Sequence, residues 1–135
     1  MTEIVKNLLI GDLNDAEHPE HLDVDIVINL SETSLHDPSG SIIYINIPMI
    51  DTDKFPIHNF FDYIEAIVET ALNNNQRVLI NCRMGLSRSV ISYAMILMRM
   101  FPDMPYNRAL EIIKSKKKID PNFGFVEQLE KYGRG

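Results

Sequence analysis

The sequence NCRMGLSRS, residues 81–89, directly follows an apolar run that ends at Ile80 and precedes a nearly all-apolar segment that reaches Met100. A short, continuous apolar run is typical of a buried central strand, and the segment beyond the loop indicates a central helix. A loop between a strand and a helix can curl its peptide N–H groups around a tetrahedral anion, which the positive helix end also attracts. The stretch therefore predicts a phosphate-binding loop in an α/β protein.

The loop also carries residues suited to phosphate chemistry. Gly85 permits a backbone conformation that a β-carbon would obstruct. Arg88, separated from Cys82 by five residues, offers a planar, permanently charged fork for two phosphate oxygens. Cys82 would lie against the same N–H groups and helix end, which favour the nucleophilic thiolate. The alternative is an inert core cysteine before an ordinary helix, because a Cys-x5-Arg spacing is common by chance; the surrounding strand, Gly85, Ser89 and helix favour the phosphate loop.

Composition restricts the kind of protein. The chain has 135 residues, 45% of them hydrophobic, which is enough for the core of one domain. Its net charge of −6 argues against the broad basic surface of a nucleic-acid-binding protein. No apolar stretch approaches the ~18 residues of a membrane span, and no secretion signal is recognisable at the N-terminus. We expect a cytoplasmic protein, with the nucleus possible, that has no membrane span and no nucleic-acid partner.

Cysteine and histidine usage gives two further expectations. A single cysteine excludes an internal disulfide and is either buried and inert or reactive. The four histidines are scattered without the spacing of metal ligands, so we expect neither a metal nor another cofactor.

Hydrophobic patterns divide the chain into strands followed by helices. Strands are predicted over residues 4–5, 8–10, 25–30, 42–47 and 77–80. Helices are predicted over residues 57–72, 89–100, 104–117 and from a cap at 120–122 to 132. No repeat or linker interrupts this order, so the patterns predict a single α/β domain.

At these residues the sequence resembles the dual-specificity branch of the cysteine-dependent protein tyrosine phosphatases. It matches the signature His-Cys-x-x-Gly-x-x-Arg-Ser/Thr except at the first position, where Asn81 stands. Further similar stretches lie at residues 8–11, 28–30, 92–95, 120–125 and 128–129. The resemblance implies a central mixed, mostly parallel β-sheet of about five strands flanked by helices, and one catalytic domain over residues 1–135.

The resemblance also implies the roles of the site residues. Cys82 would attack phosphorus and form a phosphocysteine intermediate, and Ser89 would donate a hydrogen bond to the thiolate when water releases it. The substrate would be phosphotyrosine and phosphoserine or phosphothreonine in proteins, and the enzyme a monomer. The phosphate would be held by the remaining residues of the loop: Arg83, Met84, Gly85, Leu86, Ser87 and Arg88.

Two aspartates compete for the role of general acid, which must protonate the leaving oxygen. The family supplies an aspartate from a loop about thirty residues upstream of the cysteine, where this chain has Asp51 and Asp53. Asp51 matches the family's segment better and is the predicted acid. Asp53 is the alternative, and either could instead be a solvated loop carboxylate.

Asn81 leaves the function partly open. Asparagine can replace the hydrogen bonds of the family's histidine but not its charge, so we expect a working enzyme that is weaker at low pH. One alternative is a pseudophosphatase that binds phosphoproteins without turnover. Others are a phosphoinositide or an RNA 5′-triphosphate as substrate. The basic cluster of Lys114 and residues 116–118 could receive an acidic substrate, but a solvated turn is the favoured interpretation.

Overall fold

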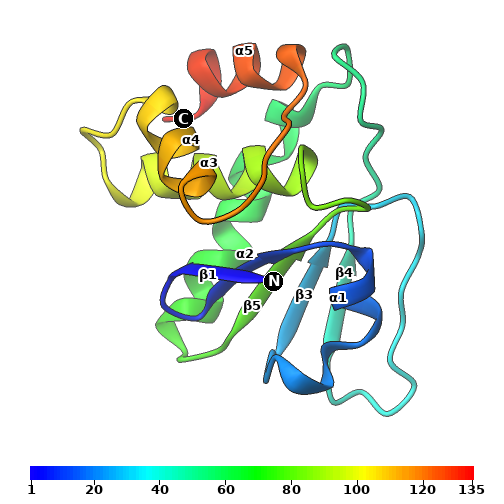
Figure 1. Cartoon of the computed structure of the whole chain (residues 1–135). Helices are drawn as coiled ribbons and strands as arrows, with labels where there is room; N and C mark the ends of the chain where they lie inside the picture. The colour runs from blue at the N-terminus through cyan, green and yellow to red at the C-terminus, as the bar shows by residue number, and fades with distance from the viewer.

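The computed structural model describes residues 1–135 and contains one five-stranded β-sheet (Figure 1). Its order is β1-β2-β5-β3-β4; β1 is antiparallel to β2, and every other neighbouring pair is parallel. The predicted mixed, mostly parallel sheet is therefore confirmed. The strands are β1 (Thr2–Val5), β2 (Leu8–Gly11), β3 (Ile26–Asn29), β4 (Ile43–Asn46) and β5 (Val78–Asn81).

Helices flank both faces of the sheet. Figure 1 shows the later helices gathered on one face, with α3 running across the centre, while α1 lies by the other face. None of the helices is long and apolar enough to cross a membrane. The helical segments are α1 (Leu13–Glu17), η1 (Pro19–His21), η2 (Ile57–Phe60), α2 (Phe61–Asn73), α3 (Arg88–Met100), α4 (Tyr106–Lys114) and α5 (Phe123–Tyr132).

Side-chain alternation along β5 shows how the two layers form. Val78 and Ile80 pack into the large core between the sheet and helices α2 to α5, whereas Leu79 packs into a smaller cluster with Ala16 of α1. All residues of this strand are buried, as expected for a parallel strand covered on both faces. The carboxyl end of β5 is thereby fixed between two layers, and Cys82 follows it directly.

Two local predictions differ from the structure, and helix α1 was missed. The helix predicted to reach Lys117 ends at Lys114, because the next residues turn back and the N–H groups of Lys116 and Lys117 both bond to the carbonyl of Ile113. The segment 57–60 is a 3₁₀ turn before α2 rather than part of that helix. Helix α1 was not predicted, since its five residues show too little periodicity; its signal was the reciprocal cap between Asp12 and Asp15.

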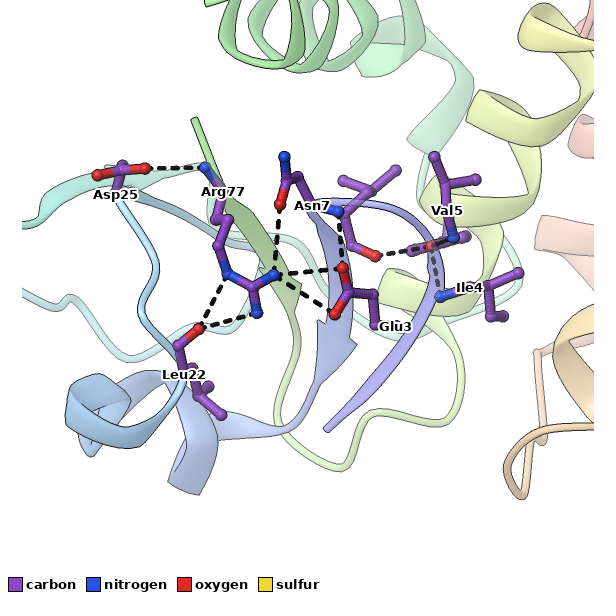
Figure 2. A network of polar contacts seen from close by, with 9 residues as sticks. Glu3, Ile4, Val5, Asn7, Leu22, Asp25 and Arg77 are labelled. Atoms are coloured by element: carbon purple, nitrogen blue, oxygen red, sulfur yellow. Dashed lines mark hydrogen bonds and ion pairs between the residues drawn. The ribbon is translucent and has the colours of Figure 1, made fainter. Parts of the chain in front are cut away.

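The amino ends of the parallel strands are joined by Arg77 (Figure 2). Its guanidinium donates hydrogen bonds to the carbonyl of Leu22 at 3.0 and 3.2 Å, to Glu3 at 3.2 Å and to Asn7 at 3.3 Å. Its backbone N–H bonds to the Asp25 carboxylate at 2.8 Å. These contacts hold the N-terminal hairpin and the segment before β3 at one edge of the sheet. The opposite side of the sheet, at the carboxyl ends of the parallel strands, is the usual place for a binding site in such sheets.

Tyr93 joins α3 to the N-terminal hairpin through a fully buried hydroxyl group. It donates to the carbonyl of Leu8 at 2.7 Å and accepts from the N–H groups of Val5 and Ile4 at 2.9 and 3.2 Å. We expect Tyr93→Phe to lower the free energy of unfolding by about 1–3 kcal/mol at pH 7, because buried backbone groups lose their partner. Urea unfolding measures this, with the exposed Tyr63→Phe as a control that should change little.

The pH dependence of that effect has a definite sign. Burial raises the pKa of Tyr93 above its ordinary value. The unfolded chain therefore loses this proton first, so the stabilisation is complete below about pH 10 and declines as the pH rises further. The stability difference between the native protein and Tyr93→Phe should narrow above about pH 10. If this stability difference widened above about pH 10 instead, the role given to the Tyr93 hydroxyl group would be contradicted.

Candidate active site

Residues 82–87 connect β5 to α3 and form a loop whose peptide groups have two different environments. None of the backbone N–H groups of residues 83–88 donates a hydrogen bond to another protein group. The carbonyls, by contrast, bond outward: that of Arg83 accepts from Leu13 N–H at 3.0 Å, and that of Leu86 from Asp120 N–H at 2.8 Å. Free N–H groups in front of a 13-residue helix form an anion-binding loop.

Gly85 allows this loop to lie close to the end of β2. Its φ is +71°, in the left-handed region that side chains disfavour. A Cβ added there would lie 3.0 Å from the carbonyl oxygen of Gly11. The glycine is therefore needed for both the conformation and the close approach.

Cys82 lies at the base of the loop and is 2% exposed. Its Sγ is 3.2 Å from Oγ of Ser89, which lies in the first turn of α3 and is itself buried. The hydroxyl of Ser89 can therefore donate a hydrogen bond to a thiolate at this position, the geometry that its predicted role requires.

Arg88 begins α3 and brings its guanidinium to the same loop. The residue is 6% exposed, and Nη1 donates to the carbonyl of Met49 at 2.7 Å. Its Nε is buried without a hydrogen-bond partner. The carboxylate of Glu32 is 3.9 Å from Nη1 and is mostly exposed. A donor left unpartnered in the interior is costly unless a ligand satisfies it, so Arg88 retains donor capacity for an anion.

Asp51 is joined to the loop by hydrogen bonds, although it lies 31 residues upstream of Cys82. Its Oδ1 accepts from Oγ of Ser87 at 2.8 Å and from Nδ2 of Asn122 at 2.7 Å. The backbone N–H of Asn122 also bonds to Ser87 Oγ, at 3.0 Å. Three separate segments thus meet at one carboxylate, which remains exposed to solvent.

Asp53 has a different environment. Its backbone lies against the start of α5, where a Cβ on Gly124 would be 1.8 Å from the Asp53 carbonyl oxygen. Its side chain makes no hydrogen bond or ion pair in the structure and is exposed. The geometry therefore favours Asp51 as the carboxylate of the site.

Asn81 belongs to a row of three asparagines at the carboxyl ends of neighbouring parallel strands. Asn46, Asn29 and Asn81 are the last residues of β4, β3 and β5 and are paired in register. Nδ2 of Asn29 donates to Oδ1 of Asn46 at 2.7 Å, and Nδ2 of Asn81 donates to Oδ1 of Asn29 at 3.0 Å. Oδ1 of Asn81 is buried without a partner. The row links the strand before Cys82 to the strand that leads toward Asp51.

Two residues of the site were not recognised from the sequence. Asn122 was predicted only as a helix cap, which it is, since its Oδ1 accepts from Phe125 N–H at 2.8 Å; its Nδ2 additionally holds Asp51. Lys117 was assigned to a solvated turn, but its ammonium group donates to the carbonyl of Gly85 in the loop. No local pattern distinguishes Lys117 from the exposed lysines beside it.

A strand, a loop with unpartnered N–H groups and a thiol at its base, and a helix that begins with arginine are the features expected of a phosphate site in which a cysteine is the nucleophile. The family model "Dual specificity phosphatase, catalytic domain" matches residues 11–135. The chain belongs to the dual specificity phosphatase family.

Individual proteins that are similar to this chain carry the name of the same family. The chain is 29% identical to dual specificity protein phosphatase 15 of Rattus norvegicus, covering 98% of this chain and 57% of that protein. It is 26% identical to dual specificity protein phosphatase 1B of Arabidopsis thaliana, covering 98% and 81%. The crystal structure of DUSP15 superposes with a TM-score of 0.92 at 27% identity, over 98% of this chain and 86% of the other. The chain thus spans little more than half of the rat protein's length.

Proposed function

We propose that the protein is a phosphatase that hydrolyses phosphotyrosine and phosphoserine or phosphothreonine in proteins through a phosphocysteine intermediate, with residues 1–135 as one catalytic domain. The observation that carries the proposal is the run of backbone N–H groups at residues 83–88 that have no protein partner and directly follow the buried thiol of Cys82. Donors arranged in advance stabilise the charge that develops on phosphoryl oxygens in the transition state. Family membership supports the same reaction.

The first half of the reaction uses Cys82, the loop N–H groups, Arg88 and Asp51. The thiolate of Cys82 attacks phosphorus while the loop N–H groups and Arg88 hold the equatorial oxygens. Asp51 donates a proton to the leaving oxygen as the P–O bond breaks, so that an alcohol departs. The hydrogen bonds from Ser87 and Asn122 support this role, because they hold the Asp51 carboxyl group at the loop.

The second half releases phosphate. Asp51, now ionised, accepts a proton from water as the water oxygen attacks phosphorus. The P–S bond breaks, and Cys82 leaves as a thiolate. The Ser89 hydroxyl, 3.2 Å from Sγ, donates to that thiolate and makes it a better leaving group.

Exposed apolar side chains beside the site support a protein substrate. Ile50 precedes Asp51, Met84 lies within the loop and Phe123 follows Asn122; they are 52%, 66% and 75% exposed. An apolar rim can contact the tyrosyl ring and the side chains that flank it in a phosphoprotein. The sequence-based alternatives of phosphoinositide and RNA triphosphate gain no such support.

Hydrolysis of an aryl phosphate and of paired phosphotyrosine and phosphothreonine peptides tests the proposal, with Cys82→Ser as the blank. We expect phosphate release from all three substrates. Binding of the peptides without release above the blank would establish the pseudophosphatase alternative instead. Release from an inositol phosphate lipid or an RNA 5′-triphosphate, but not from peptides, would replace the substrate class.

The proposal includes a monomer in a reducing compartment, the cytoplasm or the nucleus. A catalytic thiolate keeps its activity where disulfide formation is suppressed, and the chain has one cysteine. Size-exclusion chromatography with light scattering should give the mass of one chain, 15.5 kDa. Localisation of the tagged protein by microscopy checks the compartment.

Asn81→His should increase the fraction of Cys82 that is ionised to the thiolate at low pH. A histidine can still donate to Asn29 Oδ1, and unlike the amide it can carry a positive charge near the thiolate. We expect the midpoint of the pH dependence of Cys82 alkylation to fall in Asn81→His and the activity at acidic pH to rise. Asn73→His, on the exposed surface of α2, is the control. An unchanged or higher midpoint in Asn81→His would refute the proposed effect of Asn81.

A further inference from the structure

Lys117 lies outside the helices, in the turn that follows α4, and its side chain reaches the phosphate loop. Its Nζ donates to the carbonyl of Gly85 and also to that of Lys118, the latter at 2.8 Å. The adjacent Lys116 and Lys118 are exposed, whereas Lys117 is partly buried. Of this basic run, Lys117 alone is positioned by contact with the loop.

Lys117 contacts the carbonyl side of the peptide group that joins Gly85 to Leu86. The Gly85 carbonyl accepts from Lys117, while the loop's N–H groups have no protein partner. A cation bound to a carbonyl polarises the peptide chain in the direction that strengthens its N–H donors. It also holds the loop at its only glycine, the residue with the largest conformational freedom there.

The charge of Lys117 acts in a partly desolvated environment. Burial lowers its pKa, and the negative charges of Cys82, Asp12 and Asp15 oppose that shift. The interaction with Cys82 is reciprocal, so an ammonium that a thiolate stabilises also stabilises that thiolate. Because Lys117 is partly buried, its interaction with Cys82 is less screened by solvent and salt than an interaction between two exposed charges would be.

Other charged groups surround the same loop. Arg88 approaches from α3 and Asp51 from the segment after β4, and Glu32 faces Arg88. On the side of Lys117, Asp12 and Asp15 belong to the start of α1, and Asp15 also pairs with the N-terminal ammonium at 3.4 Å. Lys117 is thus the lysine in contact with the loop.

We propose that Lys117 is a positioning residue of the reaction, which anchors the Gly85 peptide and supplies a positive charge that favours the thiolate of Cys82. The inference rests on the proposed role of Cys82 as the nucleophile. It explains how the loop can sustain a thiolate with Asn81, which cannot be charged, at the position of the family's histidine. Because Lys117 does not contact the reacting atoms in this arrangement, it acts through the loop and its electric field.

The test is the pH dependence of Cys82 alkylation by iodoacetamide in the native protein and three variants. We expect the midpoint to rise by about 0.5–1 pH unit in Lys117→Gln, the size of the effect of one nearby charge at a partly screened site. Lys117→Arg keeps the charge and should stay close to the native midpoint. Lys116→Gln removes an exposed charge from the same turn and should not change it.

Each result separates this role from a purely structural one. If the alkylation midpoint of Lys117→Gln equalled that of the native protein, the proposal would be overturned, even if thermal unfolding showed that the variant is less stable. An equal rise in Lys116→Gln would also overturn it, because a general field would then suffice. Alkylation requires the thiolate and no phosphate ester, so the test remains valid for a protein that binds phosphoproteins without hydrolysing them. For an active enzyme, kcat/KM at acidic pH should fall in Lys117→Gln and recover as the pH rises.

Discussion

Cys82→Ser should hydrolyse an aryl phosphate at least ~10⁴-fold more slowly than the native chain, since removal of a covalent nucleophile eliminates the main reaction path. The serine hydroxyl is not ionised at neutral pH and is a far weaker nucleophile than a thiolate. The substitution is nearly isosteric, so the fold and the phosphate-binding groups remain. We therefore expect the variant to bind phosphopeptides with close to native affinity.

Three measurements check the expected loss of activity, the retained affinity and the covalent intermediate. Steady-state release of phosphate gives the loss of activity, and fluorescence anisotropy with a labelled phosphopeptide gives the affinity. Mass spectrometry of acid-quenched reactions should find an added phosphate on Cys82 in the native protein and none in the variant. A Cys82→Ser protein that retained about one-tenth of native activity would exclude a phosphocysteine mechanism, given the usual cost of losing a nucleophile.

Asp51→Asn should lower kcat by roughly 10²–10³-fold for an alkyl phosphate such as a phosphothreonine peptide, because general acid catalysis contributes about that much. The loss of kcat/KM, which covers the reaction only up to formation of the phosphocysteine and not the later step in which Asp51 acts as a base, should be much smaller for 4-nitrophenyl phosphate, whose leaving group departs without a proton. The amide still offers an oxygen to Ser87 and Asn122, so the loops should stay in contact. The dependence on the leaving group therefore reports the proton, not the fold.

Asp53→Asn is the matched control for that experiment. It removes a carboxylate two residues away that makes no hydrogen bond to the phosphate loop. We expect kcat within about twofold of native, as for most exposed substitutions. A collapse of alkyl phosphate turnover in Asp53→Asn, with Asp51→Asn unaffected, would transfer the role of general acid to Asp53.

The hydrogen bonds around Asp51 also bear on how the two catalytic steps are coordinated. Ser87 belongs to the phosphate loop, and Asn122 caps α5, so one carboxylate connects both to the segment after β4. Arg88 binds the carbonyl of Met49 in that same segment. The proposed acid and the segment before it are thus held against the loop that follows Cys82 and against the start of α3 and α5.

Local sequence was sufficient for the central unit of this protein. The apolar run before Asn81, Gly85 and the apolar helix after Arg88 predicted the strand, loop and helix, because each depends on residues close together in the chain. The five strands were located for the same reason, although their order required the tertiary structure. The roles of Cys82 and Ser89 stay predictions until the experiments above are done.

The tertiary structure decided what surrounds that unit. Ser87 and Asn122 distinguish Asp51 from Asp53, and the contact with Gly85 distinguishes Lys117 from its exposed neighbours. These contacts join residues 32 to 71 positions apart. The sequence determined which segments form strands, loops and helices, through periodicity and local backbone preference. Only the packing of those segments decided which polar groups meet at the loop, because hydrogen bonds and charges act over a few ångströms in space, whatever the separation along the chain.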